Sequence, residues 1–272
     1  MKSDSITPAY EKEAEKFYSQ LLKLLIDQEL PFLIGGTFAV RHYTGIKRPT
    51  KDIDIFCKAG DYPRILKAAQ EAGYKIDILD DRWLAKIYKG SFFADLIFGS
   101  IPTMWPIDDR WFKHAREGTV LNFPVKITPP EELIVSKMYR QGRTQFDGAD
   151  VIHVLLHCGN GIDWKHLLNR VEPNWEVLLA HLILFRFVYP SERGVIPTQV
   201  LTELTDRIRL QLEMPIPKDK VCRGSMLSHR QYQIAYTEWG YKDITDFFYK
   251  GDGYPLDEDE KKEPATVGEL VQ

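Results

Sequence analysis

The chain has 272 residues, 44% of them hydrophobic, so it can bury a sizeable core and has room for two modest domains. Its formal charge of −3 lacks the basic excess expected of a protein that coats nucleic acid. The longest apolar stretch, 177–189, is shorter than the ~20 residues that a membrane helix needs, so we expect no transmembrane segment and no membrane partner.

Two features indicate the compartment. The N-terminus reads MKSDSITPAYEKEAEKF, whose early acidic residues and missing apolar core argue against a secretory signal. The three cysteines, Cys57, Cys158 and Cys222, are widely spaced and odd in number, which argues against a disulfide framework. We therefore expect a cytoplasmic protein with reduced thiols.

Helices and strands alternate in the first part of the chain. Apolar residues recur at helical spacing from Tyr10 to about Gln28, which predicts a surface helix. A short apolar run at 32–34 ends in two glycines and predicts a buried strand that turns into a helix at 37–43. The further predicted elements are a strand in KDIDIFCK, a helix at 61–72, and strands at 74–79, 83–89 and 92–98.

The second part of the chain is predicted to be mainly helical. A helix begins at the prolines of PPEELIVSKMYRQ, and others follow at 147–158, 163–171, 174–189 and 198–212. We therefore predict an α+β fold, in which a small mixed β-sheet with flanking helices precedes a mainly α-helical C-terminal region. The predicted domains are 1–128 and 129–250, and the tail 251–272 is predicted to be disordered because it has little apolar surface.

Three acidic residues form the strongest chemical signal. Asp52 and Asp54 are two apart on a predicted strand, so both carboxylates project from one face, roughly 6–7 Å apart along the strand. Like charges this close repel each other unless cations neutralise them. Carboxylate oxygens suit Mg²⁺ or Mn²⁺, and Asp95 in FFADLIF is placed to complete the metal site and to accept a proton from an attacking hydroxyl.

Glycines and basic residues near these acids indicate a phosphate site. Gly35, Gly36 and Thr37 lie where a strand passes into a helix, so the backbone can approach a phosphate and the helix N-terminus faces it. The basic candidates for neutralising charge on a pyrophosphate leaving group are Arg48, Lys51 and Lys137.

Each motif alone has a structural alternative. A Gly-Gly pair is commonly a turn, and an Asp-x-Asp pair is commonly a solvated strand edge. Lys137 could equally belong to the solvated face of an amphipathic helix, together with Glu131, Glu132, Arg140 and Arg143. The order of glycine turn, acidic pair and third acid is harder to explain by turns alone.

The stretch LIGGTFAVRHYTGIKRPTKDIDIF resembles the signature of the polymerase-β-like nucleotidyltransferases. The resemblance covers about residues 30–155 and implies that Asp52, Asp54 and Asp95 are the catalytic, metal-binding acids. It implies that Gly35 to Thr37 form the phosphate-binding turn. The Arg-x-Thr before the acidic pair is similar to uncharacterised bacterial nucleotidyltransferases and to abortive-infection toxins of type IV toxin–antitoxin systems.

In those relatives, a lysine on the first helix after the catalytic domain and a following aspartate complete the site. Lys137 and then Asp147 or Asp150 match that pattern. The implied reaction is metal-dependent transfer of a nucleoside monophosphate from an NTP, such as ATP, to an acceptor, with release of pyrophosphate. The acceptor stays open among a tRNA, a small molecule and a protein, and the toxin resemblance implies an antitoxin partner. The alternative is a non-catalytic nucleotide-binding or regulatory module with the same fold.

Other motifs are weaker. His153 and His157 have the spacing of metal ligands on a helix but lack a third ligand and a general-base glutamate, so a packing role is favoured. Cys222 and His229 lie in a loop that sets no nucleophile geometry. The aromatic residues of 239–249 could stack on bases, although such spacing more often packs a helix onto the body.

Overall fold

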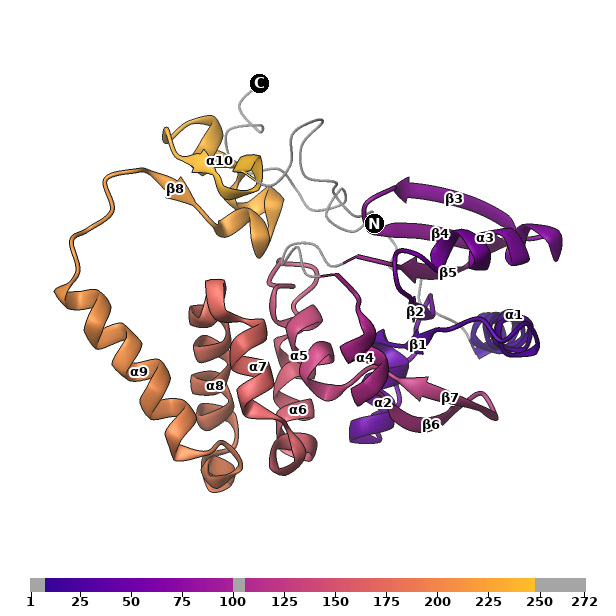
Figure 1. Ribbon diagram of the computed structural model, residues 1–272, viewed down its shortest axis with the longest axis horizontal. Coiled ribbons are helices and arrows are strands. Elements are labelled where there is room, and N and C mark those ends of the chain that lie inside the picture. Colours follow the sequence, from indigo (N-terminus) through magenta and orange to yellow (C-terminus); the bar gives the residue numbers. More distant parts are fainter. Residues whose placement is uncertain (1–7, 100–105, 248–272) are drawn as a thin grey trace. The chain divides into compact units, whose positions relative to one another are not determined.

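The computed structural model describes residues 8–99 and 106–247 of the chain. Two compact units divide it, residues 1–133 and 134–272 (Figure 1). The first unit contains a mixed seven-stranded sheet, and the second is mainly helical. The predicted α+β class is thus confirmed, whereas the predicted tail at 251–272 lies outside the described residues. In the described part, no helix has both the length and the apolar character needed to cross a membrane.

The elements of the first unit follow the predicted alternation. In chain order they are α1 (Pro8–Asp27), β1 (Leu33–Ile34), α2 (Gly36–Thr44), β2 (Asp54–Phe56), α3 (Tyr62–Glu71), β3 (Lys75–Asp80), β4 (Leu84–Lys89), β5 (Phe92–Ile97), α4 (Asp109–His114), β6 (Arg116–Val120) and β7 (Phe123–Ile127), followed by α5 (Pro130–Met138) at the unit boundary. The sheet order is β3-β4-β5-β2-β1-β7-β6. Strand β2 runs parallel to β5 and β1 parallel to β7, while the other neighbours are antiparallel.

Strands β2 and β5 are central, and their two faces differ. Ile53 and Ile55 are fully buried on one face, as the alternation in KDIDIF predicts. Phe56 lies two residues after Asp54 and therefore on the same face of the strand. Its ring stacks on Trp111 of α4. The aspartates therefore lie next to an apolar cluster that holds the ends of the strands in place.

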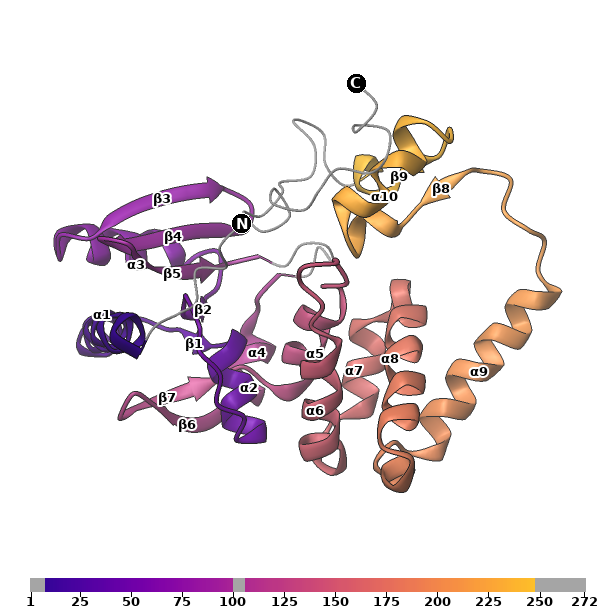
Figure 2. The same ribbon diagram turned by 180° about the vertical axis from the view of Figure 1, so that it is seen from behind.

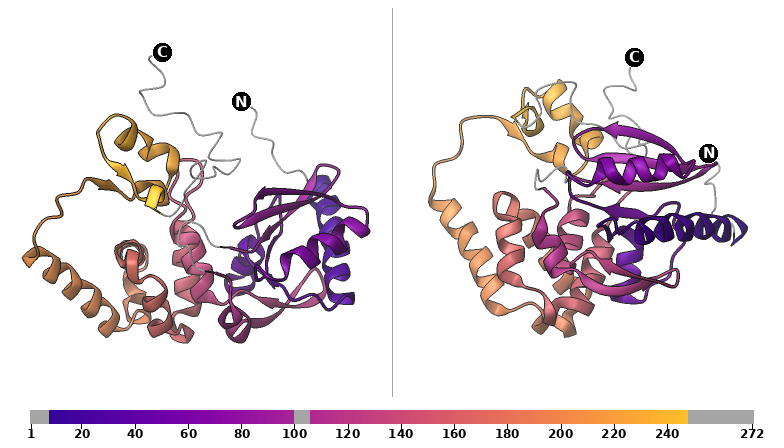
Figure 3. Two further views of the ribbon diagram at one scale, coloured as in Figure 1. Left: turned by 45° about the horizontal axis from the view of Figure 1, so that its top comes forward. Right: turned by 45° about the vertical axis from the view of Figure 1, so that its right-hand side comes forward.

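Helix α1 packs across the sheet rather than standing apart from it. Its apolar stripe, which includes Leu21, Leu22 and Leu25, is completely buried, and the helix contacts α3, β5 and β7 (Figure 3). Burying three leucines contributes on the order of 5 kcal/mol in apolar transfer free energy. This packing fixes the side chains of α1 that face the acidic residues.

The sequence prediction lacked α4 and the β6–β7 hairpin. Leu121 and Asn122 form the two-residue turn of this hairpin, and both have positive φ, 49° and 69°. Turns of this kind usually carry glycine at one of these positions. Because leucine occupies the first position here, the sequence does not indicate a turn.

The second unit confirms the four predicted helices that follow α5. Its elements are α6 (Gly148–Cys158), α7 (Trp164–Arg170), α8 (Trp175–Val188), α9 (Thr198–Glu213), β8 (Val221–Cys222), α10 (His229–Thr237) and β9 (Lys242–Asp243). Helix α8 contacts both α6 and α9, and an extended segment leads from α9 to the β8–β9 pair (Figure 2).

Candidate active site

A row of charged residues crosses four neighbouring strands of the sheet. In cross-strand register, its members are Asp77 on β3, Lys86 on β4, Asp95 on β5 and Asp54 on β2. Residues directly opposite each other share one face, and neighbouring strands lie roughly 4.8 Å apart. The parallel pairing of β2 with β5 therefore brings Asp54 and Asp95 side by side, although they are far apart in the sequence.

Lys86 is a cation that the sequence analysis did not single out. Its ammonium nitrogen donates to Asp95 Oδ1 at 2.8 Å and lies 3.8 Å from the centre of the Phe93 ring. Lys86 is only 6% exposed, so this ion pair is shielded from water. A lysine inside the buried strand LAKIYK was the available signal, because buried lysines need a partner.

Asp52 lies just before β2 instead of within it, which differs from the predicted strand. Thr50 Oγ1 donates to Asp52 Oδ1 at 2.9 Å, so this carboxylate is oriented by its own loop. In the described parts of the chain, no three His, Cys, Asp or Glu side chains form a group that could hold a metal ion. The three-carboxylate metal site at Asp52, Asp54 and Asp95 therefore stays a prediction.

The Gly35-Gly36 turn is required by neighbouring side chains. A Cβ on Gly36, whose φ is +51°, would lie 1.5 Å from Asp54 Oδ2, and one on Gly35 would lie 2.1 Å from the Phe56 ring. The Gly35 N–H also donates to the carbonyl oxygen of Asp54 at 3.0 Å. The turn thus holds the start of β2, and the missing side chain of Gly36 leaves room for the Asp54 carboxylate.

Two of the predicted phosphate ligands share a pocket. Thr37 and Arg48 line it together with Arg41, Thr50 and Tyr18. It holds about 10 Å³, and an adjoining cleft of about 450 Å³ is lined by Arg41 and Arg48 as well.

The other two basic candidates are not among the residues that line the pocket or the adjoining cleft. Lys51 is exposed and lines neither the pocket nor the adjoining cleft. Lys137 belongs to the second unit.

Tyr18 from α1 lies among the acids. Burial raises the pKa of the Tyr18 phenol above its usual range, and the negative charges of Asp52, Asp54 and Asp95 raise this pKa further. All three carboxylates therefore act on one phenol, and the phenol keeps its proton at neutral pH.

In the second unit, Lys137 forms an ion-pair cluster. Its ammonium nitrogen lies 2.8 Å from Asp147 Oδ2 and 2.8 Å from Asp150 Oδ2. Lys137 is 8% exposed, and Glu131 and Glu132 are also buried, so the alternative of a solvated helix face is wrong for these residues. Lys137 thus contacts both aspartates that the resemblance offered as partners, and its role in nucleotide binding stays a prediction.

The histidine pair on α6 has a structural contact. His157 Nδ1 lies 2.9 Å from the backbone oxygen of His153 one turn earlier. Because His157 is exposed and its ring bonds to its own helix, the favoured packing role stays a prediction for this residue.

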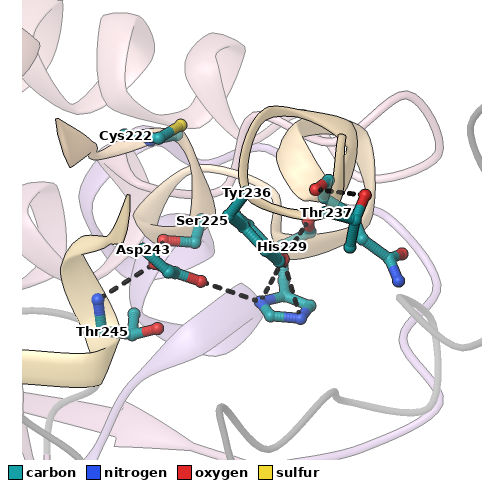
Figure 4. A network of polar contacts seen from close by, with 9 residues as sticks. Cys222, Ser225, His229, Tyr236, Thr237, Asp243 and Thr245 are labelled. Atoms are coloured by element: carbon teal, nitrogen blue, oxygen red, sulfur yellow. Dashed lines mark hydrogen bonds and ion pairs between the residues drawn. The ribbon is translucent and has the colours of Figure 1, made fainter. Parts of the chain in front are cut away.

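The Cys222 and His229 segment forms a polar network around Asp243 (Figure 4). Ser225 Oγ donates to Asp243, and the Thr245 N–H donates to the same oxygen at 3.0 Å. His229 Nδ1 lies 4.0 Å from Asp243 Oδ2, and its ring also contacts the Tyr236 hydroxyl. The serine bonds to the aspartate rather than to the histidine, so this is a packed structural network and not a nucleophile triad.

Comparisons with known proteins gave similarities in structure only. No family model matches, and no curated protein matches. The lincosamide adenylyltransferase LnuA, in its lincomycin-bound structure, is 18% identical with a TM-score of 0.40, covering 52% of this chain and 95% of that one. The antibiotic-resistance factor ANT(2'')-Ia is 15% identical with a TM-score of 0.44, covering 66% and 95%. The protein JHP933 from Helicobacter pylori is 15% identical with a TM-score of 0.41, covering 77% and 99%.

These similarities, at 15–18% identity and with TM-scores of 0.40–0.44, do not decide the superfamily, so the resemblance to the polymerase-β-like nucleotidyltransferases stays a prediction. At these identities nothing about the activity follows from the similarity, and the resemblance to the toxin branch stays a prediction. What bears on chemistry is the arrangement of the site itself.

Proposed function

We propose that the chain transfers a nucleoside monophosphate from an NTP to a hydroxyl or phosphate acceptor and releases pyrophosphate. The observation that carries this proposal is the register of Asp54 and Asp95 beside the Gly36 turn. Two carboxylates held together at a glycine turn that begins a helix combine an acidic cation site with a phosphate site.

The proposed chemistry is a displacement at the α-phosphorus. The acceptor oxygen bonds to the α-phosphorus, the bond from this phosphorus to the oxygen bridging to the β-phosphate breaks, and pyrophosphate leaves. The acceptor proton passes to the Asp95 carboxylate. Because Lys86 of β4 donates to Asp95 Oδ1, it holds this oxygen on the β4 side of β5, opposite the side on which β2 carries Asp54.

The chemistry of these side chains fits Mg²⁺ or Mn²⁺. Carboxylate oxygens of Asp54 and Asp95 would hold the ion. Asp52, which accepts from the Thr50 hydroxyl, remains the predicted third ligand, since the three acids do not form a metal-binding group in the described residues. When bound, the ion supplies positive charge that stabilises the charge developing on the phosphate oxygens.

The triphosphate is proposed to lie along the Gly35-Gly36-Thr37 turn. Thr37 and Arg48 line one pocket, which supports their assignment to phosphate binding. Lys51 and Lys137 remain proposed ligands on the basis of their charge and their place in the sequence.

Replacement of Asp54 tests the proposal. The Asp54→Asn variant is expected to lose transfer from an α-labelled NTP while it keeps its fold, because removing one charge from a like-charged pair relieves repulsion. The matched control is Asp77→Asn, which changes an exposed aspartate of the same charged row and is expected to leave transfer unchanged. Turnover retained in Asp54→Asn would rule out the assignment.

Titration and acceptor screening complete the test. Calorimetric titration with ATP, with and without Mg²⁺, distinguishes an enzyme from a binding module, for which no metal requirement is expected. Incubation with labelled ATP and a tRNA, a small-molecule or a protein acceptor then identifies the acceptor class. Binding to tRNA that weakens steeply with salt would favour the tRNA version and the predicted toxin activity.

A further inference from the structure

The Tyr18 phenol is a buried donor without a protein partner. Tyr18 is 1% exposed, and its hydroxyl makes no hydrogen bond with any described residue. A buried hydroxyl without a partner costs about 1–3 kcal/mol, so such a group in a folded protein needs an explanation.

Tyr18 lines a pocket whose other polar lining residues are four hydrogen-bond donors and two acids, Glu11 and Glu15. Thr37 and Thr50 contribute hydroxyl groups, and Arg41 and Arg48 contribute guanidinium groups. Thr50 also donates to Asp52, so the pocket adjoins the acidic residues. A cluster of neutral and cationic donors is complementary to the oxygens of an anion.

The dimensions of the pocket fit one oxygen of a larger group. Its inner part holds about 10 Å³, roughly the space of one water molecule. The adjoining cleft of about 450 Å³ shares Arg41 and Arg48 and adds Lys12 and Lys47. Four basic side chains thus line this cleft against two acidic ones, Glu11 and Glu15, which leaves an excess of positive charge.

We propose that the cleft between α1 and α2 binds the polyphosphate of the nucleotide, and that Tyr18 donates a hydrogen bond to a phosphate oxygen in the inner pocket. This inference takes the identity of the ligand from the proposed function. It adds to that function a hydrogen bond to the polyphosphate from Tyr18 of α1. Tyr18 is thereby a substrate-binding residue that satisfies its buried hydroxyl only when the polyphosphate is bound.

The test compares Tyr18→Phe with the wild-type chain in calorimetric titrations with tripolyphosphate and with ATP. Loss of one hydrogen bond to a charged group is expected to weaken both affinities about tenfold to a hundredfold. The matched control is Tyr139→Phe, which removes another buried phenol hydroxyl, in the second unit and outside the cleft, and is expected to leave both affinities unchanged.

Thermal unfolding of the ligand-free variants separates binding from a structural role. Because the Tyr18 hydroxyl has no protein partner, Tyr18→Phe is expected to unfold at the same temperature as the wild type or higher. Unchanged affinities, a lower unfolding temperature in Tyr18→Phe, or no tripolyphosphate binding by the wild type would overturn the inference. If tripolyphosphate binding depends on Tyr18 but the protein transfers no nucleotide, the proposed function is wrong while the inference about Tyr18 stands.

Discussion

The Gly36→Ala substitution tests whether the position of the Asp54 carboxylate depends on the absence of a side chain at position 36. The Cβ of Gly36→Ala would lie 1.5 Å from Asp54 Oδ2, and real Cβ contacts essentially never fall below 3.0 Å. The carboxylate oxygen must therefore move by about 1.5 Å, and a displacement of this size at a reacting centre costs roughly a hundredfold in rate. The positive φ adds about 1–2 kcal/mol of strain, and an off-rotamer Asp54 adds about 1 kcal/mol.

Gly45→Ala is the matched control for this substitution. Gly45 has a φ of +74° and nothing within 4 Å of its Cβ position, so alanine there carries the backbone strain without touching Asp54. We expect only the backbone-strain part of the loss, about 1–2 kcal/mol in the free energy of unfolding measured in urea, with transfer from labelled ATP retained. Equal loss of transfer in both variants, or transfer within a few-fold of wild type in Gly36→Ala, would refute the reasoning.

Three further substitutions test the charged groups. Lys86→Met removes the ammonium group that neutralises Asp95, so the carboxylate keeps its full negative charge for a metal ion. We therefore expect tighter Mn²⁺ binding, measured by electron paramagnetic resonance. Weaker binding would show that Lys86 and the ion do not compete for Asp95. Lys137→Met removes the cation that pairs with the buried Asp150 and the partly exposed Asp147, so we expect about 3 kcal/mol of destabilisation in urea unfolding. A loss below about 1 kcal/mol would show that the cluster is solvated. Burial lowers the pKa of His181, although its hydrogen bond to the backbone opposes this. The unfolded chain then binds the extra proton, so stability falls as the pH drops below about 6.5. The fall in the free energy of unfolding amounts to at most about 1.4 kcal/mol at about pH 5.5, and His181→Gln is expected to reduce it. If the free energy of unfolding in urea depends on pH in the same way in His181→Gln as in the wild type, His181 is not the group responsible.

Local patterns predicted most of the elements of this chain. The helical spacing in α1 and the alternation in β3 to β5 depend on neighbours only a few residues apart, so the sequence displays them directly. The β6–β7 hairpin was not predicted because its turn places Leu121 at positive φ, a conformation that usually requires glycine or asparagine.

The sequence by itself determined which residues are the candidates for the proposed chemistry, namely the acids and the glycine turn, because their spacing is local. Only the tertiary structure decided how they meet. The parallel pairing of β2 with β5 sets Asp54 beside Asp95, the hairpin of β4 and β5 places Lys86 on Asp95, and the packing of α1 brings Tyr18 to the acids. Strand register and helix packing depend on burial of side chains distant in the chain, and a local pattern contains no information about those partners.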